Sequence, residues 1–172
     1  MKVRADDNLG YWLFYTQRIV AHAFAEVLRR CCVEHAKPYV VTPPQFGVLA
    51  LLQEIDGVTI GTISQRRRID APTVTGIVKR LEQSGLVERR HDEVDRRVVK
   101  VYLTAEGRDI MKLLGDEVDN FDEILTRGIS EAEQRGILAK FHHIIVNLDA
   151  VVPTSGERFG LLPRDFLCEP ME

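Results

Sequence analysis

Residues 59–104 constrain the fold of this chain most, because they join two short helical patterns to a basic β-hairpin. The second helical pattern begins at Asp70, a good N-cap residue, and has Pro72 in its first turn. Its apolar residues follow the spacing of one buried helix face: Val74, Ile77, Val78 and Leu81. Ser84 and Gly85 are typical of a helix end. The segment predicts a short helix with one buried and one exposed face.

Two β-rich segments follow, residues 86–90 and 98–103, joined by the polar sequence HDEVDRR. This pattern predicts a β-hairpin. A helix pair beside a positively charged β-ribbon suits DNA, because the second helix can enter the major groove while the ribbon lies over a neighbouring minor groove. The alternative is a protein-interaction module that uses the same fold without DNA.

Long helical patterns flank this centre. They cover residues 7–35, 104–127 and 130–148, and Thr42 predicts the start of a further helix, with Gln45 placed for a capping box. The last pattern carries apolar residues that we expect to be buried: Ile137, Leu138, Phe141, Ile144, Ile145 and Leu148. The apolar stripes are too extensive for so small a central domain to cover. We therefore expect a homodimer in which a second copy buries them.

The fold class expected is mainly α with a small β-hairpin wing, a winged helix-turn-helix between long dimerisation helices. The domains expected are an N-terminal dimerisation helix at residues 1–36 and a DNA-binding domain at residues 42–104. C-terminal dimerisation helices follow at residues 105–151, and an irregular tail at residues 152–172.

The net charge of -3 conceals an uneven distribution. Residues 59–104 hold ten Lys/Arg and six Asp/Glu, whereas the remainder holds thirteen Lys/Arg and twenty Asp/Glu. Positive charge is thus concentrated in one segment, as phosphate binding requires. The acidic remainder would help to orient the basic face towards DNA.

Several other classes of protein are disfavoured. No apolar run approaches the roughly 18 residues of a membrane span. The start MKVRADDNLG has acids where a signal peptide needs its apolar region, so we expect a cytoplasmic protein. The three cysteines, Cys31, Cys32 and Cys168, form neither a disulfide framework nor a zinc motif.

An enzyme is also disfavoured. The chain has no nucleophile elbow with an ordered Ser/His/Asp set, no Gly-rich phosphate loop and no metal-ligand spacing. His142 and His143 are adjacent and would point in different directions on a helix, so they cannot chelate together. We expect no catalytic residues, no metal and no cofactor.

Together these motifs resemble the MarR (multiple antibiotic resistance regulator) family of bacterial transcription factors. The similarity covers roughly residues 8–150 and is strongest in DAPTVTGIVKRLEQSGL at residues 70–86, in Asp95-Arg96-Arg97, and in YLTAEG at residues 102–107. The resemblance implies a homodimeric winged helix-turn-helix protein that binds double-stranded DNA at a pseudo-palindromic operator, usually as a repressor. In many members a small phenolic or aromatic acid effector weakens DNA binding.

The candidate DNA-binding residues lie on the exposed face of the second helix and in the hairpin. The helical wheel turns one set of side chains outward or to the flanks: Pro72, Thr73, Thr75, Gly76, Lys79 and Arg80. Small residues let the backbone approach the groove floor, and Thr can contact a thymine methyl or a base edge. The resemblance places Arg97 in the minor groove, held by Asp95. The other basic residues near the hairpin are expected to be phosphate contacts or solvated charges: Arg89, Arg90, Arg96 and Lys100.

The resemblance also implies an effector cleft between the dimerisation helices and the winged helix. The candidates to line it are Trp12, Tyr15, His22 and Phe46, with Arg67 supplying positive charge. Arg67 departs from the apolar residue usual in the family and would point towards the interior of the winged helix. It could instead reach solvent or contact a DNA phosphate.

Cys31 and Cys32 leave open a redox-responsive regulator of the same fold. Such a sensor requires a stabilised thiolate. The sensing cysteine of redox-responsive relatives lies early in the first helix, whereas these two lie at its end. Two inert thiols are the simpler interpretation.

Overall fold

The computed structural model describes residues 8–67 and 69–151. Six helices and three short strands follow one another in this part of the chain: α1 (Leu9–Glu34), α2 (Pro43–Glu54), β1 (Val58–Thr59), α3 (Ile60–Arg67), α4 (Ala71–Gln83), β2 (Val87–His91), β3 (Val99–Leu103), α5 (Ala105–Thr126) and α6 (Glu131–Val151). The strands form one antiparallel sheet in the order β1-β3-β2. The mainly helical winged fold predicted from the sequence is confirmed. The expected irregular tail at residues 152–172 lies outside the described residues.

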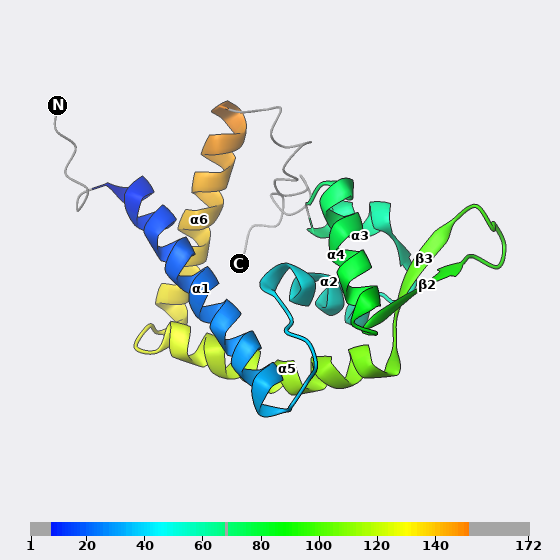
Figure 1. Cartoon of the computed structure of the whole chain (residues 1–172). Helices are drawn as coiled ribbons and strands as arrows, with labels where there is room; N and C mark the ends of the chain where they lie inside the picture. The colour runs from blue at the N-terminus through cyan, green and yellow to red at the C-terminus, as the bar shows by residue number, and fades with distance from the viewer. Residues whose placement is uncertain (1–7, 68, 152–172) are drawn as a thin grey trace.

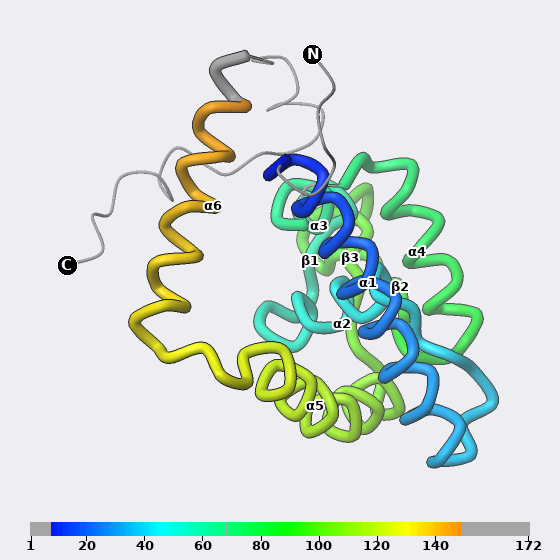
Figure 2. Tube along the Cα trace, turned by 90° about the vertical axis from the view of Figure 1, so that its left-hand side faces the viewer, coloured from blue at the N-terminus to red at the C-terminus, as the bar shows by residue number. Residues whose placement is uncertain are grey.

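Helix α5 connects the two ends of the molecule. Its first half lies under the winged-helix part, which we define as α2 to β3, and its second half reaches α1 and α6 (Figure 1). Turned by 90°, α6 stands apart from the winged-helix part while α1 lies closer to it (Figure 2). None of the described helices is both long and apolar enough to cross a membrane.

Helix α4 forms as its sequence predicts. The carboxylate of Asp70 accepts the backbone N–H of Thr73 at 2.9 Å, which satisfies one of the free donors of the first turn. The four predicted core residues are fully buried: Val74, Ile77, Val78 and Leu81. Because the Thr73 hydroxyl and amide both donate to Asp70, the pKa of that carboxyl is lowered. Its negative charge stays at the positive end of the helix.

Helices α2 and α5 also begin with capping interactions. Gln45 Oε1 accepts the backbone N–H of Thr42 at 2.9 Å and its hydroxyl at 2.8 Å, which is the predicted interaction at the start of α2. At α5, the Thr104 hydroxyl oxygen accepts the N–H of Gly107 at 3.0 Å and donates to the carbonyl of Gly85 at 2.7 Å. Thr104 therefore ties the start of α5 to the turn that follows α4.

The predicted hairpin is present and gains a third strand. Strand β2 pairs with β3 from Val87 opposite Leu103 to His91 opposite Val99. Strand β1 pairs with the other edge of β3, with Val58 opposite Val101. This pairing anchors the base of the wing to the turn after α2, so that the wing projects as a ribbon beside α4 (Figure 1).

The buried core lies within the winged-helix part and the adjoining portions of α1 and α5. Helix α6 contributes little to this core. Four of its large apolar side chains, which the sequence predicts to be buried, are between 41% and 60% exposed in the single chain: Ile137, Leu138, Phe141 and Leu148. One copy of the chain does not bury this face.

Candidate nucleic-acid interface

The exposed face of α4 is the one that the sequence predicts. Of the six candidate residues on this helix, Gly76 is half-buried, and the other five are exposed: Pro72, Thr73, Thr75, Lys79 and Arg80. A Cβ built on Gly76 would meet no atom within 4 Å, so glycine is not required there by packing. Because glycine has no side chain, nothing projects from the centre of the exposed face, and a ligand can approach the helix backbone closely there.

The two threonines on this face have their hydroxyl protons engaged. Thr73 Oγ1 donates to Asp70 at 2.7 Å, and Thr75 Oγ1 donates to the carbonyl of Ala71 at 2.8 Å. What remains available on each is a methyl group and the acceptor capacity of the oxygen. These groups suit a thymine methyl or an amino group at a base edge in the major groove.

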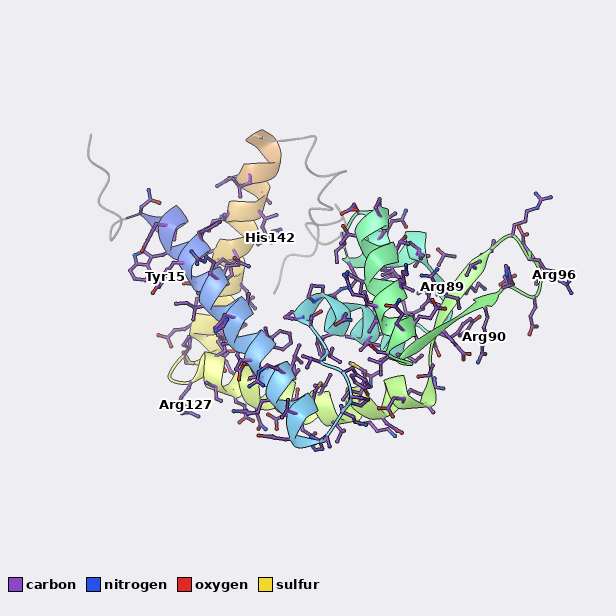
Figure 3. All side chains as sticks on the ribbon, in the orientation of Figure 1. Tyr15, Arg89, Arg90, Arg96, Arg127 and His142 are labelled. Atoms are coloured by element: carbon purple, nitrogen blue, oxygen red, sulfur yellow. The ribbon has the colours of Figure 1, made fainter. Side chains whose placement is uncertain are left out.

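The wing loop holds Arg97 through its backbone. The Asp95 carboxylate accepts the backbone N–H of Arg97 at 3.0 Å, and the Asp95 carbonyl accepts the N–H of Val98 at 2.9 Å. The side chains of Arg96 and Arg97 are exposed. Arg96 lies at the far end of the wing, whereas Arg89 and Arg90 lie nearer its base (Figure 3).

Most of the other basic residues of the wing interact within the chain. Arg89 pairs with Glu82 at 3.5 Å, and Lys100 pairs with Asp92 at 2.5 Å. Arg90 pairs with Glu88, and its guanidinium also lies 5.0 Å from the ring centroid of Tyr102. A phosphate would have to compete with these partners. The tip arginines, Arg96 and Arg97, are better placed to meet DNA.

Asp92 organises the wing loop and was missed from the sequence. Its carboxylate accepts the backbone N–H groups of Val94 and Asp95, both at 3.0 Å, besides pairing with Lys100. An aspartate that receives amides two and three residues ahead is the signal of an Asx turn, and the Asp92-Glu93-Val94-Asp95 sequence carries it. The loop that presents the tip arginines is thus preformed.

Asp92 also predicts a pH dependence of the wing. The ammonium of Lys100 and the two amides lower the pKa of Asp92 to about 2. Because the pKa is lowered in the fold, the carboxylate stabilises the loop above pH of about 4, and this contribution is lost as the pH falls towards 2. We expect carboxyl NMR to show this titration, and Asp92→Ala to speed hydrogen exchange at the amides of Val94 and Asp95. Glu93→Ala removes the same charge from the same loop and should leave the exchange rates of both amides at their wild-type values. If Asp92→Ala and Glu93→Ala show the same exchange rates at these amides, Asp92 does not organise the loop.

The candidate effector residues are dispersed. Trp12 and Tyr15 pack edge to face on α1, with ring centroids 5.8 Å apart, and each is nearly half exposed. Phe46 packs against Phe24 at 5.4 Å. His22 lines a small cavity of about 230 Å³ at the start of α2. Of the three cavities characterised among the described residues, none is lined by more than one of the five candidates.

Arg67 does not point into the winged helix. Its side chain is exposed, and its guanidinium lies along α2, where a Cβ added to Gly47 would come within 2.4 Å of Nη2. The interior position expected from the sequence is therefore wrong. The absence of a side chain at Gly47 leaves room for the long arginine stem and guanidinium to lie against the helix.

Two larger apolar cavities lie where α6 approaches the rest of the chain. One, of about 840 Å³, is lined by Leu9 and Leu13 of α1 and by Ile137, Phe141 and Ile144 of α6. The other, of about 680 Å³, also borders α5 and includes Val20 and Leu125 in its lining. None of the five candidate effector residues lines either of them.

The two cysteines of α1 are buried, at 1% and 0% exposure. Burial raises the pKa of Cys31, which disfavours its thiolate. In a Cys168→Ser variant, which removes the third thiol, we expect Cys31 and Cys32 to react with a thiol reagent at least roughly a hundredfold more slowly in the folded protein than in denaturant, because labelling requires local opening. Rapid labelling of the folded protein would favour the redox alternative.

Within the described residues, no group of three or more His, Cys, Asp or Glu is arranged to hold a metal.

Comparison with known proteins agrees with this geometry. Residues 41–99 match the model of the MarR family. The regulator TtmR of Methylorubrum extorquens is 39% identical over 103 residues, which cover 60% of this chain and 51% of TtmR, so the chain spans about half the length of that relative. A probable transcriptional regulator from Pseudomonas aeruginosa has a similar structure, with a TM-score of 0.68 and 27% identity over 80% of this chain and 99% of that one. The repressor CouR, solved on a 23-mer DNA duplex, has the same fold, with a TM-score of 0.71 and 24% identity over 84% of this chain and 99% of that one.

The fold and its exposed basic face define a winged helix-turn-helix domain, and the relatives that it resembles are transcriptional regulators. Residues 41–99 match the model of the MarR family, so the resemblance to that family seen in the sequence is confirmed for this part of the chain.

Proposed function

We propose that the chain is a homodimeric repressor that binds a pseudo-palindromic operator in double-stranded DNA. Helix α4 would enter the major groove with Thr73, Thr75, Lys79 and Arg80, and Arg97 would enter the minor groove. The observation that carries this proposal is the joint exposure of these side chains on one helix and one preformed wing tip, while the apolar residues of α4 are buried. A guanidinium in a narrow minor groove responds to shape and negative potential more than to base identity.

The proposed dimer uses the helices that flank the winged-helix part, within residues 1–36 and 105–151. Support comes from the exposed apolar side chains of α6 and from the apolar cavities between α6 and α1. A second copy that packs its own helices into this region would remove this apolar surface from water. Dimerisation also sets two copies of α4 at a fixed distance, which a palindromic site requires.

Selection from random DNA tests this proposal. The purified protein should enrich a palindrome whose half-site centres lie about one helical turn, about 10 base pairs, apart. The matched control is the double variant Lys79→Ala, Arg80→Ala, which alters only the exposed face of α4 and should enrich no sequence. A folded, dimeric wild-type protein that enriches nothing would contradict DNA recognition and favour the protein-interaction module.

We further propose that a small aromatic or phenolic acid releases the repressor from its operator. CouR from Rhodococcus jostii, which has the same fold, was solved with p-coumaroyl-CoA. In this chain we propose contact with such a compound first for Trp12 and Tyr15, whose rings pack together on α1. His22, Phe46 and Arg67 would join them only if the dimer closes a site around all five residues. An effector acts only if it binds one dimer geometry better than another.

Displacement of operator DNA tests the effector. Benzoate, salicylate and p-coumarate, added at millimolar concentration, should include a compound that weakens operator binding by about 5- to 150-fold, the usual range of coupling between sites. The Trp12→Ala variant should need more of that compound while its operator affinity without the compound stays the same. If none of these acids displaces DNA from the wild-type protein, the aromatic-acid effector is rejected.

A further inference from the structure

Three side chains from two distant parts of the sequence meet at the start of α5. Lys37 Nζ lies 2.8 Å from Glu106 Oε1, and the Tyr39 hydroxyl donates to the same oxygen. Lys37 and Tyr39 belong to the linker between α1 and α2, whereas Glu106 lies in the first turn of α5. We call these residues the Glu106 cluster. The Lys37 side chain is only 19% exposed, so this interaction is less screened by water than a surface ion pair.

On one side, the cluster is fixed to the winged-helix part. Glu106 stands between Thr104, whose N–H donates to the carbonyl of Leu86 at 3.2 Å, and Gly107, whose Cα lies against the same carbonyl. Leu86 in turn lies in the short turn between α4 and β2. The first turn of α5 therefore moves with α4 and the wing.

On the other side, the cluster is fixed to α1. The backbone N–H of Lys37 donates to the carbonyl of Cys32 at 2.9 Å, and Ala36 between them has a φ of 50°. This is the arrangement that closes a helix end, with alanine in the left-handed position that glycine usually occupies. The linker is thus folded back onto α1, so Lys37 moves with that helix.

The charges of the cluster are complementary at neutral pH. The Lys37 ammonium and then the Tyr39 hydroxyl lower the pKa of Glu106, so the carboxylate stays ionised. Burial and then the hydrogen bond to Glu106 raise the pKa of Tyr39, so its hydroxyl remains a donor. One carboxylate oxygen therefore receives two donors that both come from the linker.

We infer that Glu106 is a positioning residue for operator recognition: through Lys37 and Tyr39 it fixes the winged-helix part relative to α1, and so sets the half-site spacing that the dimer accepts. This inference rests on the proposed function. The Glu106 cluster touches no proposed DNA contact. Its loss should therefore change which spacing is accepted without changing how one half-site is bound.

A spacing series tests the inference. Affinity is measured for the selected operator, for versions with two base pairs inserted or removed between the half-sites, and for a duplex with a single half-site. The variant Lys37→Met, Tyr39→Phe removes both donors and leaves α4, the wing and α5 unaltered. We expect its single half-site affinity to stay within about twofold of the wild type, while its preference for the selected spacing falls by about tenfold, a typical coupling effect.

The matched control is Arg30→Met. It removes the same charge as Lys37→Met and breaks another ion pair between α1 and α5, that of Arg30 with Glu117 at 3.4 Å, but it does not touch the linker. The control should keep the wild-type preference. The inference is overturned if the Lys37→Met, Tyr39→Phe variant keeps the preference, if Arg30→Met loses as much of it, or if single half-site affinity falls in parallel. A wild-type protein that accepts every spacing equally would overturn the proposed palindrome as well, so the two failures are distinguishable.

Discussion

Replacing Arg97 with alanine should weaken operator binding by about 1–3 kcal/mol, which is the usual contribution of one specific arginine contact to DNA. The substitution removes the guanidinium and leaves the loop in place, because Asp95 holds residue 97 through its backbone N–H. The loss should therefore appear in affinity and not in stability. Fluorescence anisotropy with the selected operator, together with thermal unfolding of the variant, measures both quantities.

The control for this prediction is Lys112→Ala. Lys112 carries the same charge as Arg97 but lies on α5, away from the wing, with its side chain 76% exposed. If the Arg97 effect came from net charge alone, both variants would lose affinity equally. An Arg97→Ala variant that binds as tightly as the wild type would remove this residue from the DNA-binding surface.

Gly107→Ala should destabilise the fold by about 1–3 kcal/mol or more, the range for groups forced into a packed region. A Cβ at this position would lie 2.0 Å from the carbonyl oxygen of Leu86, which is backbone and cannot rotate away. Helix α5 would have to shift from the turn after α4, and the hydrogen bonds of Thr104 to Gly85 and Leu86 would lengthen. Chemical denaturation measures the loss in the free energy of unfolding.

Gly115→Ala on the same helix is the matched control. A Cβ there meets no atom within 4 Å, so the usual preference of helices for alanine should apply, with a gain of up to about 1 kcal/mol. Opposite signs at Gly107 and Gly115 would identify close packing at the wing base as the cause. A stabilised Gly107→Ala protein would show that the turn after α4 is free to move.

The parts of the fold that the sequence predicts well depend on local rules. Asp70 and Thr104 each accept an amide three residues ahead, and Gln45 accepts the amide of Thr42 three residues back, so each helix start could be located from neighbouring letters alone. The buried face of α4 follows from its spacing in the same way. The wing was predicted because two β-rich segments flank a polar turn.

The parts that could not be predicted depend on contacts between distant residues. Glu106 meets Lys37 and Tyr39 across 69 and 67 positions of the chain, and no local pattern marks such a contact. Arg67 could not be placed because its position depends on the open space beside Gly47 of another helix. Ala36 occupies a left-handed position where local rules would favour glycine.

The most direct test of the central claim is dimethyl sulfate protection on the selected operator. The reagent methylates guanine N7 in the major groove and adenine N3 in the minor groove, so one experiment monitors both grooves. If two copies of α4 occupy successive major grooves, guanines should be protected in two half-sites about 10 base pairs apart, with adenines protected beside them. Arg97→Ala should then lose only the adenine protection. Protection of a single half-site, or of adenines without guanines, would contradict the account.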